Sequence, residues 1–291
     1  MQFSFDPRLI DIAFKEEDRE RLTPYSELDI VLRALGQKIK EALVDNFVGM
    51  YLQGSLAIGG FDLTSDVDFI VVTKDDLSED QVNSVQAVHD QTYLQDNRWV
   101  RRLEYSFFPL KLINSPSSPY ENGVANTSEE RKLWYFDNGH QTITRSDHCN
   151  TLVTRWTLRE MGITVIGPDP QTVIDLVAAD SLKKEIKETL IGWGQEIIED
   201  PKPYENRFYQ AYLVLNFARM LQDMCERRIT SKLEGASWAK EESDPKWREL
   251  IDYCWQERQD PDISVIQPAD PKMYRQSIEF VRYAVDQARS Y

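Results

Sequence analysis

Two aspartates, Asp66 and Asp68, stand directly against the apolar run FIVV, and this feature restricts most how the chain can fold. Such a run is typical of a buried strand, and a carboxylate beside a buried strand is unfavourable unless a positive group meets it. Residues two positions apart on a strand project from the same face. The sequence therefore predicts a strand that presents two carboxylates together to a positively charged partner.

A Gly-Ser pair, Gly54 and Ser55, comes before the aspartates, and the whole segment has the spacing G-S-x10-D-x-D. A glycine at a strand end lets the backbone approach a ligand closely. A serine that opens a helical turn offers its hydroxyl and free N–H groups to an anion. Two carboxylates can hold Mg²⁺, which commonly completes its coordination with phosphate oxygens of a nucleotide. We therefore expect the positive partner to be Mg²⁺ bound together with a nucleoside triphosphate.

A third carboxylate, Glu104, interrupts another apolar stretch, RRLEYSFF. If the reaction transfers a nucleotidyl group to a hydroxyl, a carboxylate near that hydroxyl can accept its proton. Glu104 would face the same cleft as the aspartates if its strand neighbours theirs. Asp62 is closer in sequence but belongs to a turn, so it is the weaker candidate. We predict Glu104 as the catalytic base and, with Asp66 and Asp68, as a metal ligand.

Helical and strand-like segments alternate through the first part of the chain. Residues 25–45 have helical spacing, and residues 99–113 are predicted as a long strand, the third after those that hold Gly54 and Asp68. Beyond a Pro-Asp-Pro sequence, almost every segment has a helical pattern. We predict an α+β fold with a boundary near residues 167–171: a mixed sheet with flanking helices in 1–170, and an all-α helical bundle in 171–291.

Composition narrows the class of partner. The chain has 291 residues, with 49 acidic and 34 basic side chains and a net charge of −15. This balance argues against a nucleic-acid binder, which needs a basic surface, and favours a cationic small molecule. Cys149, Cys225 and Cys254 lie far apart, which indicates thiols in a reducing compartment. No signal peptide or membrane span is expected, so we predict a cytoplasmic protein, with a monomer favoured.

The spacing G-S-x10-D-x-D, followed by an acid on the next strand, resembles the polymerase-β-like nucleotidyltransferase superfamily. Within it, the whole chain is similar to aminoglycoside adenylyltransferases of the streptomycin/spectinomycin type. The resemblance implies a nucleotidyltransferase domain in 1–170, a helical domain in 171–291, and a cleft between them for ATP and the drug. The segment LNFARMLQDMCERRITSKLEGASWAKE is similar to a nucleotide-contacting segment of these enzymes, and the resemblance assigns that contact to Arg219 and Lys232.

The resemblance also implies a substrate site near the start of the LNFAR segment, where the family has acidic and tryptophan side chains. Here the matching stretch offers Glu205, with Tyr209 and Tyr212 at the positions of the expected polar contacts. Arg228 stands where the family has a glycine.

The predicted function is transfer of AMP from ATP to a hydroxyl of a small acceptor, with release of pyrophosphate. The first choice of acceptor is an aminoglycoside. Two alternatives stay open: an acceptor that is a protein or another metabolite, and a nucleotide-sensing protein without turnover. For Asp147 and His148 we favour a cap or hydrogen-bond role over catalysis, and Trp134 suits the core as well as a substrate contact.

Overall fold

Six strands form one mixed sheet. The computed structural model describes residues 21–115, 118–121 and 124–291, and within them the strand order is β7-β6-β3-β2-β1-β8. β2 and β3 run parallel, and the other neighbouring pairs are antiparallel. The strands are β1 (Phe47–Leu52), β2 (Val67–Thr73), β3 (Leu103–Pro109), β6 (Leu133–Phe136), β7 (Thr144–Ser146) and β8 (Ile163–Ile166).

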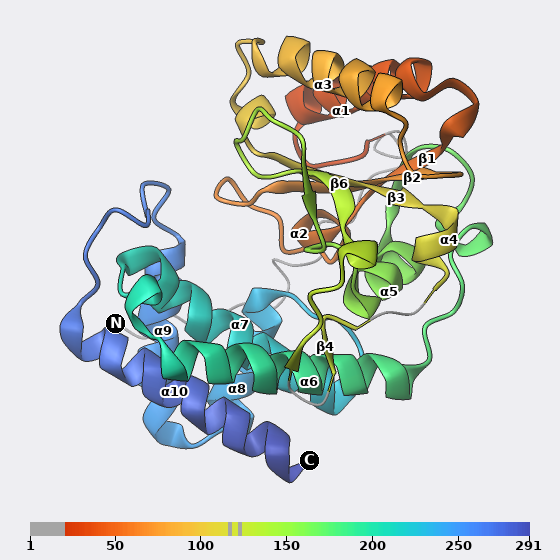
Figure 1. Ribbon diagram of the computed structural model, residues 1–291. Helices are drawn as coiled ribbons and strands as arrows, with labels where there is room; N and C mark the ends of the chain where they lie inside the picture. Colours follow the sequence, from red (N-terminus) through yellow and green to blue (C-terminus); the bar gives the residue numbers. More distant parts are fainter. Residues whose placement is uncertain (1–20, 116–117, 122–123) are drawn as a thin grey trace.

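The two faces of the sheet pack against different helices. Val67 and Phe69 belong to the core that the sheet shares with α1 and α3, whereas Ile70 packs with Leu158 of α5 on the opposite face. Because side chains alternate along a strand, Asp68 lies on the α5 face. That face is turned toward the helical lobe (Figure 1). The helices around the sheet are α1 (Ser26–Leu43), α2 (Gly54–Ala57), α3 (Glu79–Tyr93), α4 (Leu110–Ile113) and α5 (Leu152–Met161).

The second part of the described chain is helical, and α7 is its centre. α7 is buried on several sides because it packs against α6, α8, α9 and α10. The predicted α+β fold, with a mixed sheet followed by a helical bundle, is confirmed, while the boundary at residues 167–171 stays a prediction. The helices of this lobe are α6 (Ala179–Glu199), α7 (Arg207–Glu226), α8 (Lys232–Glu242), α9 (Arg248–Arg258) and α10 (Pro271–Ser290).

The predicted long strand over residues 99–113 was wrong in its extent. The segment divides into a 3-10 turn at Arg98–Arg101, the strand β3, and the short helix α4. The side chain of Asn97 accepts a hydrogen bond from the Trp99 N–H and so starts the turn. At the other end Pro109 has no N–H to continue the ladder, and it becomes the N-cap of α4.

Two strands of the sheet, β6 and β7, were not predicted. Both are short, β6 pairs with the distant strand β3, and among the described strands β7 pairs only with β6. The segment before β6 also contains a small hairpin, β4 (Tyr120–Glu121) with β5 (Val124–Ala125).

The hairpin connects the sheet lobe to the helical lobe. Tyr120 packs on α6 at Gly192, where a Cβ would lie 2.3 Å from the tyrosine ring. Glu185 of α6 also accepts hydrogen bonds from the first N–H groups of α5, those of Leu152 and Val153. The two lobes are thus joined beside the face that carries Asp68. None of the helices in the described ranges is long and apolar enough to cross a membrane, and the expectation about a signal peptide concerns residues outside those ranges.

Candidate active site

The three predicted acids lie together at one end of the sheet. The parallel pairing of β2 with β3 sets Asp68 directly opposite Glu104. Since partners in a parallel ladder project from the same face, both side chains leave the α5 face. Asp66 comes just before β2, and its Oδ1 accepts a hydrogen bond from the Asn138 amide. The expectation that the strand of Glu104 neighbours the strand of Asp68 is confirmed.

These acids are close enough to disfavour one another's ionisation. Burial raises the pKa of Asp68 well above its usual range, and the charges of Glu104 and Asp66 raise it further. The pKa of Asp66 is also raised, first by burial and then by Glu104. Adjacent carboxylates that repel in this way need a cation to keep them all charged.

Gly54 is set by two requirements at once. Its φ of +56° lies in the left-handed region, and a Cβ at this position would lie 2.3 Å from Asp68 Oδ2. The neighbouring Gln53 N–H donates a hydrogen bond to the Asp68 carbonyl oxygen at 3.0 Å. The Gly-Ser turn, with Ser55 in α2, is therefore packed directly against the aspartate that follows it in the motif. The close approach predicted for this glycine is made to the Asp68 side chain.

Glu104 has a neighbour, His148, for which a cap or hydrogen-bond role was expected from the sequence. His148 Nε2 lies 3.2 Å from Glu104 Oε1, with the His148 side chain 64% exposed and the Glu104 side chain 13% exposed. The hydrogen bond to Glu104 raises the pKa of His148. The predicted hydrogen-bond role is therefore confirmed for His148, and its partner is the predicted catalytic base.

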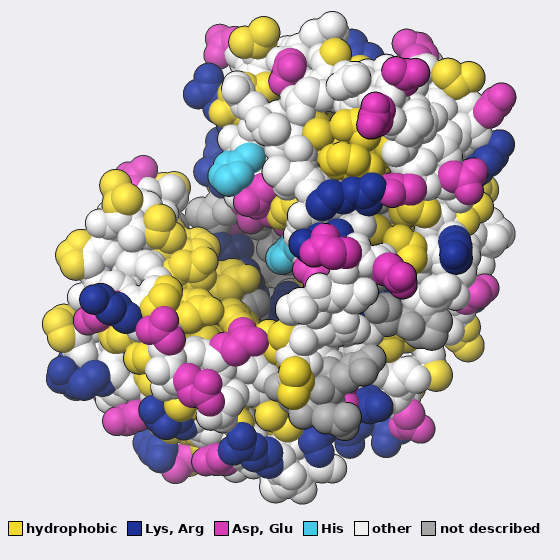
Figure 2. Space-filling view, in the orientation of Figure 1, with side chains coloured by type: hydrophobic (Ala, Val, Ile, Leu, Met, Phe, Trp, Pro, Cys, Tyr) yellow, Lys and Arg dark blue, Asp and Glu magenta, His cyan; other side chains and the backbone are white. Residues whose placement is uncertain are grey.

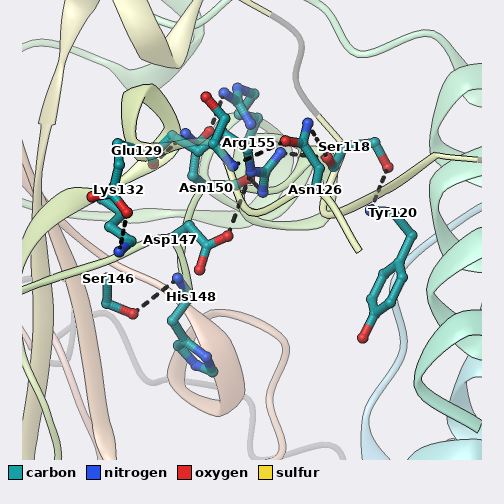
Figure 3. A network of polar contacts seen from close by, with 12 residues as sticks. Ser118, Tyr120, Asn126, Glu129, Lys132, Ser146, Asp147, His148, Asn150 and Arg155 are labelled. Atoms are coloured by element: carbon teal, nitrogen blue, oxygen red, sulfur yellow. Dashed lines mark hydrogen bonds and ion pairs between the residues drawn. The ribbon is translucent and has the colours of Figure 1, made fainter. Parts of the chain in front are cut away.

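A buried polar network holds the segment that carries His148. Asp147 pairs with Arg131, and Arg131 donates to the Asn150 carbonyl oxygen at 2.9 Å. Arg155 donates to the Asn150 side chain at 2.7 Å. Figure 3 shows Asp147 turned toward this network and the His148 ring turned away from it. Asp147 thus has a structural role, which leaves the neighbouring imidazole free to reach Glu104.

Cationic side chains of the helical lobe face the acids. The Ser231–Glu234 capping box starts α8 and so holds Lys232 in the first turn. The pKa of Lys232 is lowered to about 7 by burial and by the charges of Arg219 and Arg258, while Asp66 and Asp68 oppose the shift. The loop that follows the Gly-Ser turn approaches the same helix end, since a Cβ at Gly60 would lie 3.1 Å from Ser231 Cβ. Lys232, assigned by resemblance alone, therefore lies in electrostatic range of Asp66 and Asp68. Arg219, assigned in the same way, lies in electrostatic range of Lys232.

Arg258 was not found from the sequence. It is the last residue of α9, and its guanidinium Nη2 lies 3.2 Å from Asp62 Oδ2 in the turn before Asp66. Its local sequence, QERQD, does not distinguish it from a solvated helix end. Only the tertiary contact identifies it as a member of the cleft. Asp62, the weaker candidate for the base, is held by this arginine.

Aromatic side chains of α7 form another part of the cleft wall. The Lys232 Nζ lies 4.8 Å from the centre of the Tyr212 ring. Tyr212 also stacks with Phe208 and meets Tyr209 edge to face. Burial raises the pKa of Tyr212, and Glu104 is among the charges that add to this shift. Figure 2 shows a hollow between the lobes, with acidic and histidine side chains on one wall and hydrophobic side chains on the other.

The acids alone do not complete a binding site for Mg²⁺. The described residues contain no group of three or more His, Cys, Asp or Glu side chains that could hold a metal ion. The expected ligand trio is therefore not assembled by protein side chains alone, and Glu104 as a ligand stays a prediction. Asp66 and Asp68 still offer the hard oxygen donors that Mg²⁺ requires when nucleotide phosphates supply the other oxygens.

Two family profiles match the chain, one in each lobe. Residues 37–135 match a profile described as a nucleotidyltransferase domain, and residues 172–286 match one described as the C-terminal domain of aminoglycoside adenylyltransferase. The two matched segments lie on either side of the predicted boundary.

Curated relatives and a solved structure agree with the profiles. A protein named spectinomycin 9-adenylyltransferase from Staphylococcus aureus is 28% identical over 217 residues, which cover 69% of this chain and 74% of the relative. One of the same name from Campylobacter jejuni is 24% identical over 208 residues, covering 67% of this chain and 72% of the relative.

The crystal structure of a spectinomycin adenyltransferase from Enterococcus faecialis with ATP and spectinomycin has a similar fold. The TM-score is 0.64 at 13% identity, over 91% of this chain and 100% of that one. The order of the two profiles, the relatives and the site geometry agree, and the chain belongs to the aminoglycoside adenylyltransferase-like nucleotidyltransferases.

Proposed function

We propose that this chain transfers AMP from ATP to a hydroxyl group of an aminoglycoside and releases pyrophosphate. The observation that carries the proposal is the register of β2 and β3, which sets Asp68 and Glu104 side by side on one face. The relatives named spectinomycin 9-adenylyltransferase support both the transfer and the class of acceptor.

In the proposed reaction Glu104 accepts the proton of the acceptor hydroxyl. The hydroxyl oxygen bonds to the α-phosphorus of ATP while the bond from that phosphorus to the bridging oxygen breaks, and pyrophosphate leaves with the electron pair. Asp66 and Asp68 would hold Mg²⁺, which when bound stabilises negative charge on the phosphate oxygens. The side chain of His148, 3.2 Å from Glu104, orients the carboxylate of the base.

The nucleotide would be held by residues from both lobes. Gly54 and Ser55 belong to the turn beside Asp68. From the helical lobe, the charge of Lys232 acts on Asp68, and the charge of Arg219 acts on Lys232. Pyrophosphate carries more negative charge after the bond breaks, so the two cations favour its departure in their direction.

The α7 wall favours a second candidate acceptor. Phe208, Tyr209 and Tyr212 offer rings, and a polycationic acceptor gains more from carboxylates than from phenol groups. The same adenylyl transfer to a less charged metabolite, with its apolar face on these rings, is therefore the alternative that this wall supports.

Purified protein incubated with ATP, Mg²⁺ and a panel of aminoglycosides that includes spectinomycin tests the proposal through pyrophosphate release. Release that depends on one of these compounds supports the first acceptor class. Release only with another metabolite or a protein supports the alternative acceptors, and nucleotide binding without release under any condition supports a sensor. Loss of release after removal of Mg²⁺ by a chelator, with recovery on its return, tests the predicted metal.

A further inference from the structure

Arg258 joins the two lobes at the turn that leads into Asp66. Its Nη1 donates to Thr64 Oγ1, its Nη2 lies 3.4 Å from Ser65 Oγ, and the same nitrogen pairs with Asp62. Ser65 is the residue immediately before Asp66. The position of this guanidinium therefore affects where the first metal-site aspartate lies.

Asp62 does not satisfy all of the donors of Arg258. The Arg258 Nε is buried and has no hydrogen-bond partner among the described residues, and the same holds for the Nε of Arg219. A buried donor of a charged group without an acceptor is unfavourable. Two guanidinium groups near one cleft thus each retain a donor that an anionic ligand can satisfy.

The charges around Lys232 also favour an anionic ligand. The charges of Arg219 and Arg258 both disfavour protonation of Lys232, and burial disfavours it more strongly. The half-buried Lys232 amine and the two guanidinium groups repel one another, and a multiply charged anion between them stabilises all three. Arg258 also acts on Asp66, whose pKa it lowers, so the guanidinium is near both the cations and the acids.

We propose that Arg258 is a further nucleotide-contacting residue, which binds the polyphosphate of the triphosphate while it holds the turn at Asp62, Thr64 and Ser65. One anion then contacts the end of α9 in the helical lobe and, through this arginine, fixes the segment that carries Asp66 in the sheet lobe. This inference rests on the proposed function for the identity of the triphosphate.

The test measures affinity by calorimetry for ATP, AMP and inorganic tripolyphosphate, each with Mg²⁺. Arg258→Gln is expected to lower the affinity of the protein for ATP and for tripolyphosphate roughly 10- to 100-fold, since a hydrogen bond to a charged group is lost. The affinity for AMP, which has no β- and γ-phosphates, should change less than about two-fold. Arg258→Lys should fall between wild type and Arg258→Gln, because it keeps the charge and loses the fork of donors.

Two matched variants separate phosphate binding from a purely structural clamp. Asp62→Asn removes the charge partner of Arg258 and should leave ATP affinity within about three-fold of wild type. Arg248→Gln changes an exposed arginine at the other end of α9 and should alter none of the three affinities. Thermal unfolding of each variant shows that the protein is folded when binding is measured.

Several results would overturn the inference. ATP affinity unchanged in Arg258→Gln, equal weakening of ATP and AMP, or an Asp62→Asn effect as large as that of Arg258→Gln would each reduce Arg258 to a clamp between the lobes. Failure of tripolyphosphate to bind wild type would also overturn it. If wild type binds ATP and tripolyphosphate but transfers no AMP to any acceptor, the proposed function fails while the role of Arg258 stands.

Discussion

Buried acids occur in both lobes, but they are surrounded differently. In the helical lobe, the Glu185 carboxylate accepts hydrogen bonds from two backbone N–H groups, and Asp223 accepts from the N–H and hydroxyl of Thr230. In the sheet lobe, no described residue donates a hydrogen bond to the Asp68 carboxylate. The charges of Glu104 and Asp66 each raise its pKa more than His148 or Lys232 lowers it. An acid that serves the fold has its acceptors satisfied, whereas Asp68 is left for a partner that the chain does not supply.

The largest effect is expected from Asp68→Asn. Loss of one carboxylate should reduce AMP transfer on the order of 10³-fold or more. The same change should raise the melting temperature by a few degrees, because a neutral amide removes repulsion from Glu104 and Asp66. Turnover and thermal unfolding are measured on the same preparations.

The exposed Asp75→Asn is the control for Asp68→Asn, and it should change neither turnover nor melting temperature. An Asp68→Asn protein that is less stable than wild type would show that the charge of Asp68 serves the fold, and the contrast between the two lobes would be lost.

Glu104→Gln should separate chemistry from binding. Without a base to accept the hydroxyl proton, kcat is expected to fall roughly 10²- to 10⁴-fold. The affinity for ATP should stay close to wild type, because the amide keeps the shape of the side chain beside His148. Single-turnover rates and nucleotide titrations distinguish the two quantities. A large loss of ATP affinity with kcat retained would assign Glu104 to the metal site instead.

Glu185→Gln should have the opposite profile to Asp68→Asn. Its amide oxygen can accept from one of the two N–H groups at the start of α5, which leaves the other buried without an acceptor. We expect the free energy of unfolding to fall by about 1–3 kcal/mol, as measured by urea denaturation. Turnover of the folded protein at low temperature should persist. A variant as stable as wild type would mean that these hydrogen bonds contribute nothing to the fold.

A pair of glycines tests the packing of the motif against Asp68. Gly54→Ala places a methyl group 2.3 Å from Asp68 Oδ2 at a φ of +56°, whereas Gly59→Ala at a φ of +77° meets nothing within 4 Å. Both changes carry a backbone penalty of about 1 kcal/mol, and only the first also displaces the carboxylate. Gly54→Ala should therefore lose stability and turnover together, and Gly59→Ala stability alone. Equal turnover in the two variants would contradict the role of the close approach.

The acid wall could be predicted because its signal is local. Asp66 and Asp68 stand out against an apolar run, and Glu104 stands out in the same way within another strand. The assignment of Glu104 to the same cleft depended on the condition that its strand neighbours the strand of Asp68, and the pairing of β2 with β3 meets that condition. The α+β order could also be predicted from the sequence, since helical periodicity extends through most of the second half of the chain.

The rest depends on contacts between distant segments. β6 is only four residues long, and it becomes a strand because Tyr105 and Ser106 of β3 pair with it. Arg258 belongs to the cleft only because α9 ends beside the turn at Asp62. His148 follows a strand that was itself not predicted, so its approach to Glu104 had no local signal. No pattern within a single segment encodes such juxtapositions.

The last effect concerns the pH dependence of stability at Asp223, the satisfied acid of α7. Burial raises its pKa to about 6, although the charge of Arg219 and the hydrogen bonds from Thr230 oppose the shift. The pKa of an aspartate in the unfolded chain is about 4. Between about pH 4 and pH 6 the folded state therefore binds a proton at Asp223 that the unfolded state has released. The contribution of Asp223 to stability is therefore fully present below pH 4 and is lost as the pH rises through about 6, by up to about 3 kcal/mol.

Asp223→Asn keeps the oxygen that accepts from Thr230 and removes the titration. Urea denaturation of wild type and variant across pH 4–8 should give a difference in stability that grows in favour of the variant between about pH 4 and 6 and is constant above. A difference that does not vary with pH would mean that Asp223 ionises in the folded protein as it does in the unfolded chain. The charge of Arg219 and the hydrogen bonds from Thr230 would then together offset burial completely and keep this buried acid charged. Asp68, which lacks such donors among the described residues, would then differ from Asp223 even more sharply.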